Sequence, residues 1–198
     1  MHVPATERKD QLIRATVELM RRDGVQRLNL RAIAEEAGAS LAAVHYCFDG
    51  KDDLLRHAVE YWLQRMVELP EVDTEAGVGL EAAIDRIAGA FWTALEENPH
   101  DVLAQIELVA WSVREAPRLD LAESIYRRYE EALADVFTKA LADAGQDVSW
   151  DMGDFARAFV MIVDGASLQY MADPGSDRHR RTFHRLLLLS AQDALKQS

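Results

Sequence analysis

Apolar residues recur along this chain at intervals of three and four, and this spacing limits the fold more than any other feature. Positions three and four apart lie on one face of an α-helix, as do Leu80, Ile84, Ile87, Phe91 and Leu95. We find no segment in which Val, Ile and Thr alternate with polar residues between turns, as strands require. Only 5 prolines and 10 glycines interrupt the 198 residues, which leaves room for long helices. The sequence therefore predicts an all-α protein of about nine helices.

Capping residues and helix breakers divide the chain into predicted helices. Asn29 and Ser40 suit N-cap positions, and Gly24 and Gly145 are typical helix stops. The predicted helices are Thr6–Asp23, Leu30–Ala37, Leu41–Cys47, Lys51–Leu69, a fifth that begins near Leu80, a sixth from Pro99 to near Ala116, Leu119–Ala144, Asp151–Ala172 and Arg178–Lys196. Residues 70–79 form the clearest linker.

Charge is distributed unevenly along the chain. Residues 1–48 hold seven basic and six acidic side chains, a net charge of +1. Residues 61–198 hold 13 basic and 24 acidic side chains, a net charge of −11. Such a chain can bind nucleic acid through its head alone, because the acidic body repels phosphates. An acidic surface that only keeps a protein in solution has the same pattern, so charge does not decide between the two.

The rest of the composition excludes several classes of protein. A single cysteine cannot form a disulfide framework or a cysteine-based zinc site, and it suits a reducing compartment. No apolar run approaches the roughly 20 residues that a membrane span needs. The N-terminus also lacks the apolar stretch of a signal peptide. We therefore expect a cytoplasmic protein that does not associate with membranes.

Two short predicted helices, Leu30–Ala37 and Leu41–Cys47, follow a longer one and are joined by a tight turn at Gly38. This arrangement is typical of a helix-turn-helix, although a plain hairpin inside a helical bundle has the same spacing. The outward positions of the second short helix are small or flat: Leu41, Ala42, Ala43, His45 and Tyr46. The major groove of DNA admits such a helix, which favours DNA binding.

The residues of this region resemble a known family. They form, in order, the groups Arg31-Ala-Ile33-Ala34, Ala37-Gly38-Ala39-Ser40, Val44-His45-Tyr46-Cys47-Phe48, Lys51 and Leu54-Leu55. This composite pattern, over about residues 6–56, resembles the DNA-binding domain of the TetR/AcrR family of transcriptional regulators. The resemblance implies an N-terminal helix-turn-helix DNA-binding domain at residues 1–50. It also implies a helical-bundle domain for effector binding and dimerisation at residues 51–198.

The resemblance implies a function as well as a fold. It implies a ligand-responsive transcriptional regulator, a homodimeric repressor that a small-molecule effector releases from a palindromic operator in double-stranded DNA. A two-fold dimer reads two half-sites at once, so the palindrome follows from the symmetry of the protein. Such a regulator is not an enzyme and needs no cofactor or metal.

Carried over residue by residue, the resemblance implies a set of DNA contacts. They are Arg31, Ser40, Leu41, Ala42, Ala43, His45, Tyr46 and Lys51. Arg31 can reach a base edge or a phosphate, and Lys51 is a point charge for a phosphate. His45, Ala39 and Cys47 depart from the family pattern, and the recognition helix has no Asn, Gln, Lys or Arg. Direct readout would then rest on Arg31 and on apolar contacts to thymine methyl groups, which leaves the operator sequence unpredicted.

Aromatic and embedded polar residues in the body predict an effector site. The candidate effector-binding residues are Trp92, Glu107, Trp111, Tyr126, Tyr129 and Asp164. Small-molecule sites are usually aromatic-lined cavities with one or two polar groups. A carboxylate of Glu107 or Asp164 beside a tryptophan would suit a cationic or hydrogen-bonding aromatic ligand. A purely apolar pocket for a fatty-acyl or terpenoid-like effector is equally compatible with the sequence.

The last two predicted helices carry apolar stripes that predict the dimer interface, as the resemblance also implies. The candidate interface residues are Phe159, Ala166, Tyr170, Phe183, Leu187 and Ala191. Leu188 and Leu189 widen the apolar arc of the last helix beyond what one packed face requires. Burial of this helix within its own subunit is the alternative.

Two functions from other classes compete with the regulator. A di-iron helical-bundle enzyme needs two Glu-x-x-His pairs with two further glutamates. The chain has one match, Glu97 to His100, and Pro99 interrupts the helix there. A helical protein-interaction module without DNA binding is the second alternative, and the presence of Arg31, Tyr46 and Lys51 argues against it.

Overall fold

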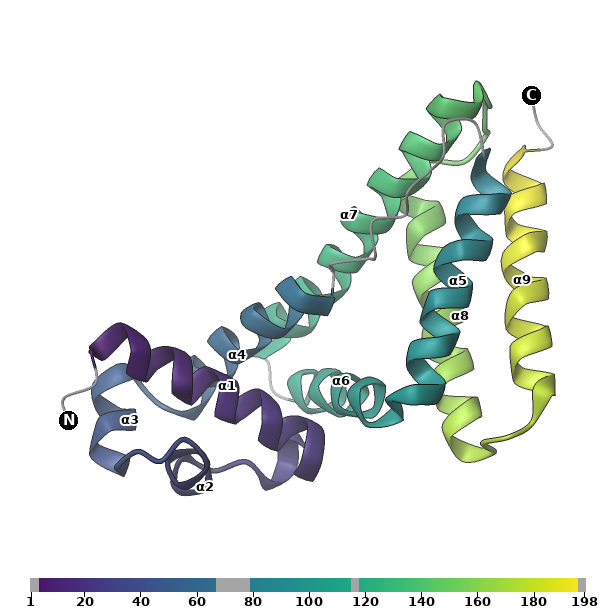
Figure 1. The fold of residues 1–198 in the computed structure, drawn as a ribbon. Coiled ribbons are helices and arrows are strands. Elements are labelled where there is room, and N and C mark those ends of the chain that lie inside the picture. The colour runs from purple at the N-terminus through teal and green to yellow at the C-terminus, as the bar shows by residue number, and fades with distance from the viewer. Residues whose placement is uncertain (1–3, 67–78, 115–117, 196–198) are drawn as a thin grey trace. The chain divides into compact units, whose positions relative to one another are not determined.

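The computed structural model of the protein describes residues 4–66, 79–114 and 118–195. Within these ranges all regular secondary structure is helical, which confirms the predicted all-α fold class. The elements are α1 (Ala5–Asp23), the short 3₁₀ helix η1 (Val25–Arg27), α2 (Leu30–Glu36), α3 (Leu41–Cys47), α4 (Lys51–Met66), α5 (Gly79–Glu97), α6 (Pro99–Ser112), α7 (Leu119–Ala144), α8 (Met152–Ala172) and α9 (Asp177–Leu195) (Figure 1).

Most predicted helix bounds agree closely with those of the structure, but α6 ends at Ser112 and not near Ala116. The bounds of α3 and α7 are as predicted, and α1 and α9 each begin one residue earlier. The 3₁₀ helix η1 was not predicted, because three residues carry no periodic pattern. The end of the predicted fourth helix and most of the predicted linker, residues 67–78, lie outside the described residues.

Contacts between Cα atoms divide the chain into two compact units. The first unit comprises Met1–Met66 and His100–Glu123, and the second comprises Val67–Pro99 and Ser124–Ser198. Helix α6 and the first turn of α7 thus belong with α1–α4. The predicted domain boundary at residue 50 divides the chain by function and not by packing, so it stays a prediction.

In the first unit, α1 packs along α4, and α2 and α3 pack against α1. Leu12 and Met20 of α1 are fully buried with Ile33 of α2, Val44 of α3 and Leu54 of α4. Each fully buried side chain of this size contributes about 1.5–3 kcal/mol, so the two short helices are held by packing and not by their own length.

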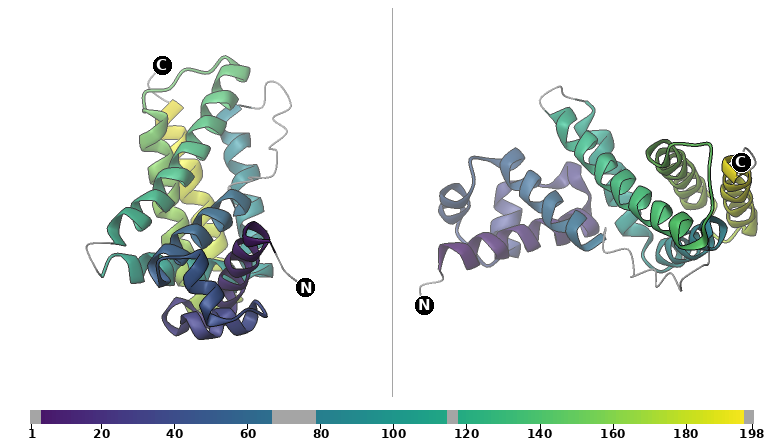
Figure 2. Two further views of the ribbon diagram at one scale, coloured as in Figure 1. Left: turned by 90° about the vertical axis from the view of Figure 1, so that its left-hand side faces the viewer. Right: turned by 90° about the horizontal axis from the view of Figure 1, so that it is seen from above.

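In the second unit, α9 lies beside α8 and α5 (Figures 1 and 2). Aromatic rings make contacts between these helices and α7. Phe137 of α7 contacts Phe155 and Phe159 of α8, with ring centroids 5.3 and 5.6 Å away. Trp92 of α5 contacts Tyr170 of α8 and Phe183 of α9, both at 5.4 Å. Among the described residues, no helix is long and apolar enough to cross a membrane.

Candidate functional site

Local side-chain caps begin the two short helices of the first unit. The Asn29 Oδ1 atom accepts a hydrogen bond from the Ala32 amide at 3.0 Å, which begins α2. Ser40 Oγ accepts one from the Ala43 amide at 3.2 Å, which begins α3. Gly38 has a φ of +58° in the turn between them, a left-handed conformation that favours glycine. Both predicted caps are confirmed, and they fix the direction in which α3 leaves the turn.

The outward face of α3 is accessible and almost free of charge. Tyr46 is 81% exposed, and Ser40, Ala42 and His45 are also exposed. Leu41 and Ala43 are half-buried, whereas Val44 is buried and points into the core. Because the exposed side chains are small at Ser40 and Ala42 and flat at His45 and Tyr46, this helix can approach a flat or grooved partner closely.

The two candidate cations outside α3 differ in exposure. Arg31 is exposed on α2, which packs against α3. Lys51, the first residue of α4, is half-buried instead. Burial lowers the pKa of the Lys51 ammonium, and the nearby charge of Arg118 lowers it further, whereas Asp52 raises it. The structure thus places all eight candidate DNA contacts in the first unit.

The aromatic ring of Trp111 on α6 lies close to two cations in the first unit. The Lys51 Nζ atom is 5.7 Å from the ring centroid, and the Arg118 guanidinium carbon is 4.0 Å from it. Arg118 Nε also donates a hydrogen bond to Asp52 Oδ2 at 3.1 Å. A cation over a tryptophan face is held electrostatically, so Trp111 restrains the position of Lys51.

A second set of contacts joins α6 to the end of α1. Glu107 Oε2 accepts a hydrogen bond from the Val25 amide at 3.3 Å. Arg21 donates two hydrogen bonds to the Asp101 carboxylate, the longer of them from Nη2 at 3.1 Å. The proximity of Asp101 raises the pKa of the Arg21 guanidinium. Glu107 and Trp111, both candidate effector residues, therefore have partners in the first unit.

Three other candidate effector residues meet between α7 and α8 of the second unit. The Tyr126 hydroxyl donates a hydrogen bond to Asp164 Oδ2 at 2.9 Å. Burial raises the pKa of the Asp164 carboxyl, and the bond from Tyr126 opposes that rise. Burial and the charge of Asp164 both raise the pKa of the Tyr129 hydroxyl. The sixth candidate, Trp92, lies in the aromatic cluster with Tyr170 and Phe183.

The raised pKa of Asp164 has a consequence for stability. The folded protein binds this proton more tightly than the unfolded chain does, so ionisation of Asp164 destabilises the fold above its raised pKa. We expect Asp164→Asn to raise the melting temperature at neutral pH by about 2–4 °C, the shift that roughly 1 kcal/mol gives at this chain length. The gain should vanish as the pH falls toward about 4, where the unfolded aspartate is also protonated. Thermal unfolding at several pH values measures it, and a gain that grows on acidification would contradict it.

Comparison with known proteins agrees with this arrangement. Residues 12–58 match the family model described as bacterial regulatory proteins, tetR family. The chain is 37% identical over 181 residues to the HTH-type nicotine-responsive transcriptional repressor HdnoR of Paenarthrobacter nicotinovorans, covering 91% of this chain and 92% of the relative. The chain belongs to the TetR family.

Solved structures of TetR regulators share the fold over nearly the whole chain. A TetR transcription regulator from Haloarcula marismortui has a TM-score of 0.72 at 25% identity, and the match covers 96% of this chain and 99% of that one. FadR from Bacillus subtilis, in complex with stearoyl-CoA, has a TM-score of 0.68 at 18% identity, covering 93% and 98%. The predicted function, a ligand-responsive transcriptional repressor of the TetR family, is thereby confirmed. TetR regulators bind DNA and small-molecule effectors and act as dimers.

The candidate dimer residues of this TetR regulator lie mostly inside the protomer. Phe159, Phe183, Leu187 and Ala191 are each no more than 3% exposed. Of these four, Phe183 lines the surface groove described next, as Ala166 does. The sixth candidate, Tyr170, is half-buried against Trp92.

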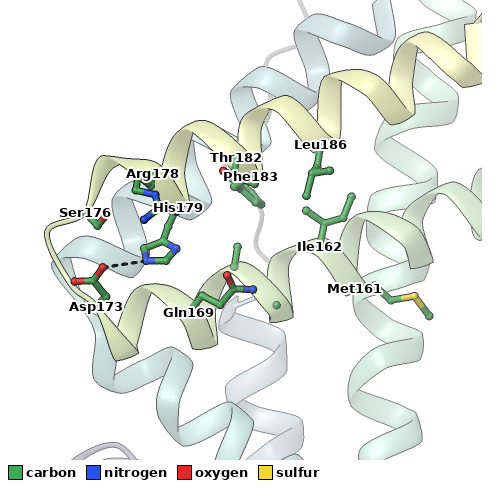
Figure 3. Close-up of a pocket in the computed structure, with 12 residues that line it drawn as sticks. Met161, Ile162, Gln169, Asp173, Ser176, Arg178, His179, Thr182, Phe183 and Leu186 are labelled. Atoms are coloured by element: carbon green, nitrogen blue, oxygen red, sulfur yellow. Dashed lines mark ion pairs between the residues drawn. The ribbon is translucent and has the colours of Figure 1, made fainter.

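The outer surface of α8 and α9 carries a groove of about 600 Å³ (Figure 3). Ile162 and Leu186 line its apolar part, and Asp173 and His179 face each other at its polar end, with 3.7 Å between Oδ2 and Nε2. Met161 and Leu186, which line the groove, are exposed, and so are Leu168 and Leu189 on the same two helices. The i, i+4, i+7 spacing of Met161, Gly165 and Leu168 could have identified this face, but the inward stripe of α8 is equally apolar.

Proposed function

We propose that this TetR regulator binds a palindromic operator through α3, with one recognition helix from each protomer in successive major grooves, roughly 34–36 Å apart. The observation that carries the proposal is the capped, exposed face of α3, which has Arg31 beside it and Lys51 at the start of α4. Arg31 is proposed to contact a base edge or a phosphate, and Lys51 a phosphate. The small Ala42 and the flat rings of His45 and Tyr46 on α3 support close contact with groove walls.

We further propose that a small organic effector binds at the Tyr126, Tyr129 and Asp164 cluster and releases the operator. The similarity to HdnoR makes nicotine the first compound to test. Helix α6 supports a route from effector to DNA, because it continues the chain from α5 of the second unit and contacts Lys51 and Val25 in the first. A coupling of about 1–3 kcal/mol weakens operator binding roughly 5–150-fold, which is sufficient for control.

The experiment that tests operator binding uses fluorescence anisotropy with labelled duplexes selected from random DNA or taken from upstream of the protein's own gene. We expect salt-sensitive, sequence-selective binding that saturates at two protomers per site, or at four if dimers pair. A scrambled duplex serves as the control. Binding no tighter than to the scrambled duplex, with no sequence recovered by selection, would favour the interaction-module alternative.

The dimer interface is proposed on the exposed apolar face of α8 and α9, at the groove of Figure 3. Leu186→Ala removes apolar surface twice in a symmetric dimer, because both protomers carry the change. We expect the dimer dissociation constant to rise about tenfold, the effect of about 1.4 kcal/mol. Analytical ultracentrifugation measures it. Leu119→Ala, which truncates a similarly exposed leucine of the first unit, should leave the constant unchanged. Equal effects of the two variants would place the interface elsewhere.

A further inference from the structure

Asp164 is a half-buried carboxylate that lacks a positively charged partner among the described residues. Within residues 4–66, 79–114 and 118–195, the hydrogen bond to Asp164 is the 2.9 Å bond from the Tyr126 hydroxyl, a neutral donor. By contrast, the carboxylate of Glu130 on α7 pairs with Arg157, which lies on α8 as Asp164 does, at 3.2 Å. A buried charge is normally paired because desolvation is costly. The protein therefore retains a carboxylate that its own fold leaves incompletely compensated.

Two aromatic rings accompany this carboxylate. Tyr126 and Tyr129 are three residues apart on α7, so they lie on the same side of that helix. Tyr126 touches Asp164 directly, and the charge of Asp164 is close enough to Tyr129 to raise its pKa. A carboxylate beside aromatic rings is the chemistry that binds organic cations, because the ring faces and the carboxylate all attract positive charge.

We infer that the effector of this regulator is an organic cation, such as a protonated or quaternary amine, whose charge is neutralised by Asp164 beside the rings of Tyr126 and Tyr129. This inference rests on the proposed effector function of the same cluster. An anionic ligand would be repelled by Asp164. A purely apolar ligand would remove water from the carboxylate and supply no counter-charge, so Asp164 would have to take up a proton for that ligand to bind.

The test compares two compounds of the same shape that differ in charge, phenyltrimethylammonium and tert-butylbenzene. The quaternary nitrogen is charged at every pH, so a change in its binding reports on the protein alone. Calorimetry with the full-length protein measures binding without DNA. We expect the cation to bind wild type at least tenfold more tightly than the neutral compound. In Asp164→Asn, which keeps the acceptor for Tyr126, this preference should disappear.

A control variant separates a local effect from the general negative charge of the body. Asp154→Asn removes an exposed carboxylate from the same helix and should leave the tenfold preference intact. Thermal unfolding of Asp164→Asn shows that the variant is folded, so a lost preference then reports on the site.

The failure of this inference differs from the failure of the proposed function. Equal binding of the two compounds, no binding of either, or unchanged cation binding by Asp164→Asn would overturn the assignment of a cationic effector. Operator binding, measured separately by anisotropy, would stand in each of these cases. If the cation binds through Asp164 but leaves the anisotropy of the protein–operator complex unchanged, the cation site is real and its role in release is overturned.

Discussion

Arg31→Ala is expected to weaken operator binding by about 30-fold or more. A well-placed arginine contact to a base is worth about 1–3 kcal/mol, and the dimer loses it in both half-sites, so the total loss is about 2–6 kcal/mol. The side chain is exposed on α2 and makes no ion pair among the described residues, so its removal should not lower the melting temperature. Anisotropy titration of the operator measures the loss, and it should also relax selectivity at one position of each half-site.

Loss of a phosphate contact is expected to change the salt dependence of operator binding, whereas loss of a base contact changes its sequence preference. Lys51→Met keeps an apolar stem against Trp111 but removes the ammonium. If Lys51 binds one phosphate in each half-site, the plot of log binding constant against log salt concentration should become less steep by about 1.8 in the variant. The sequence preference should change little. Arg114→Ala removes an exposed cation from the same unit and is the control. If Arg31→Ala binds the operator as wild type does, or if Arg114→Ala weakens binding equally, the assigned roles are wrong.

The features that could be predicted from the sequence are those with local causes. Asn29 and Ser40 cap α2 and α3 because a short polar side chain reaches an amide three residues ahead. The end of α7 at Ala144 follows from Gly145, which has a φ of +60°. Such determinants lie within a few residues of the boundary they set, so one sequence is enough to recognise them.

The features that could not be predicted depend on partners distant in the sequence. On α8, the stripes that contain Phe159 and Met161 are both apolar, yet Phe159 is buried and Met161 is 66% exposed. Only the packing of α5, α7 and α9 decides which stripe is covered. Periodicity identifies an apolar face but not its partner, so it could not show that Phe159, Leu187 and Ala191 are buried within the protomer.

The same limit applies to α6. Glu107 and Trp111 are polar and aromatic residues in a helix that the resemblance assigns to the effector domain, which suggested an effector role. Their partners in the structure are the Val25 amide and the Lys51 and Arg118 side chains, all in the first unit. The contacts of Glu107 with Val25 and of Trp111 with Lys51 join residues 82 and 60 positions apart, which no local pattern reveals. Asp164 and Tyr126 could be singled out as embedded polar and aromatic groups, but their pairing required the structure.

Gly24→Ala is expected to be the most destabilising of the single substitutions considered. Gly24 ends α1 with φ +82° and ψ 157°, a conformation that is almost exclusive to glycine. A Cβ atom there would lie 2.5 Å from Glu107 Oε2. Backbone strain costs about 1–3 kcal/mol, and displacement of Glu107 also breaks its hydrogen bond to the Val25 amide, worth about 1 kcal/mol. We therefore expect a loss of about 2–4 kcal/mol and a melting temperature at least about 4 °C lower.

Two further variants separate the backbone strain from the contact with Glu107. Gly145→Ala also places a side chain at positive φ, +60°, but nothing lies within 4 Å of its Cβ, so it should cost only about 1–2 kcal/mol. Glu107→Ala removes the clashing carboxylate. We therefore expect Glu107→Ala to destabilise the Gly24→Ala protein less than it destabilises the wild type, so that the two changes in unfolding free energy differ from additivity by about 1 kcal/mol. Strict additivity of the two changes would show that Gly24 and Glu107 are not coupled. Coupling would instead establish that α6 is fastened to the end of α1, the connection through which an effector signal is proposed to reach the DNA-binding helices.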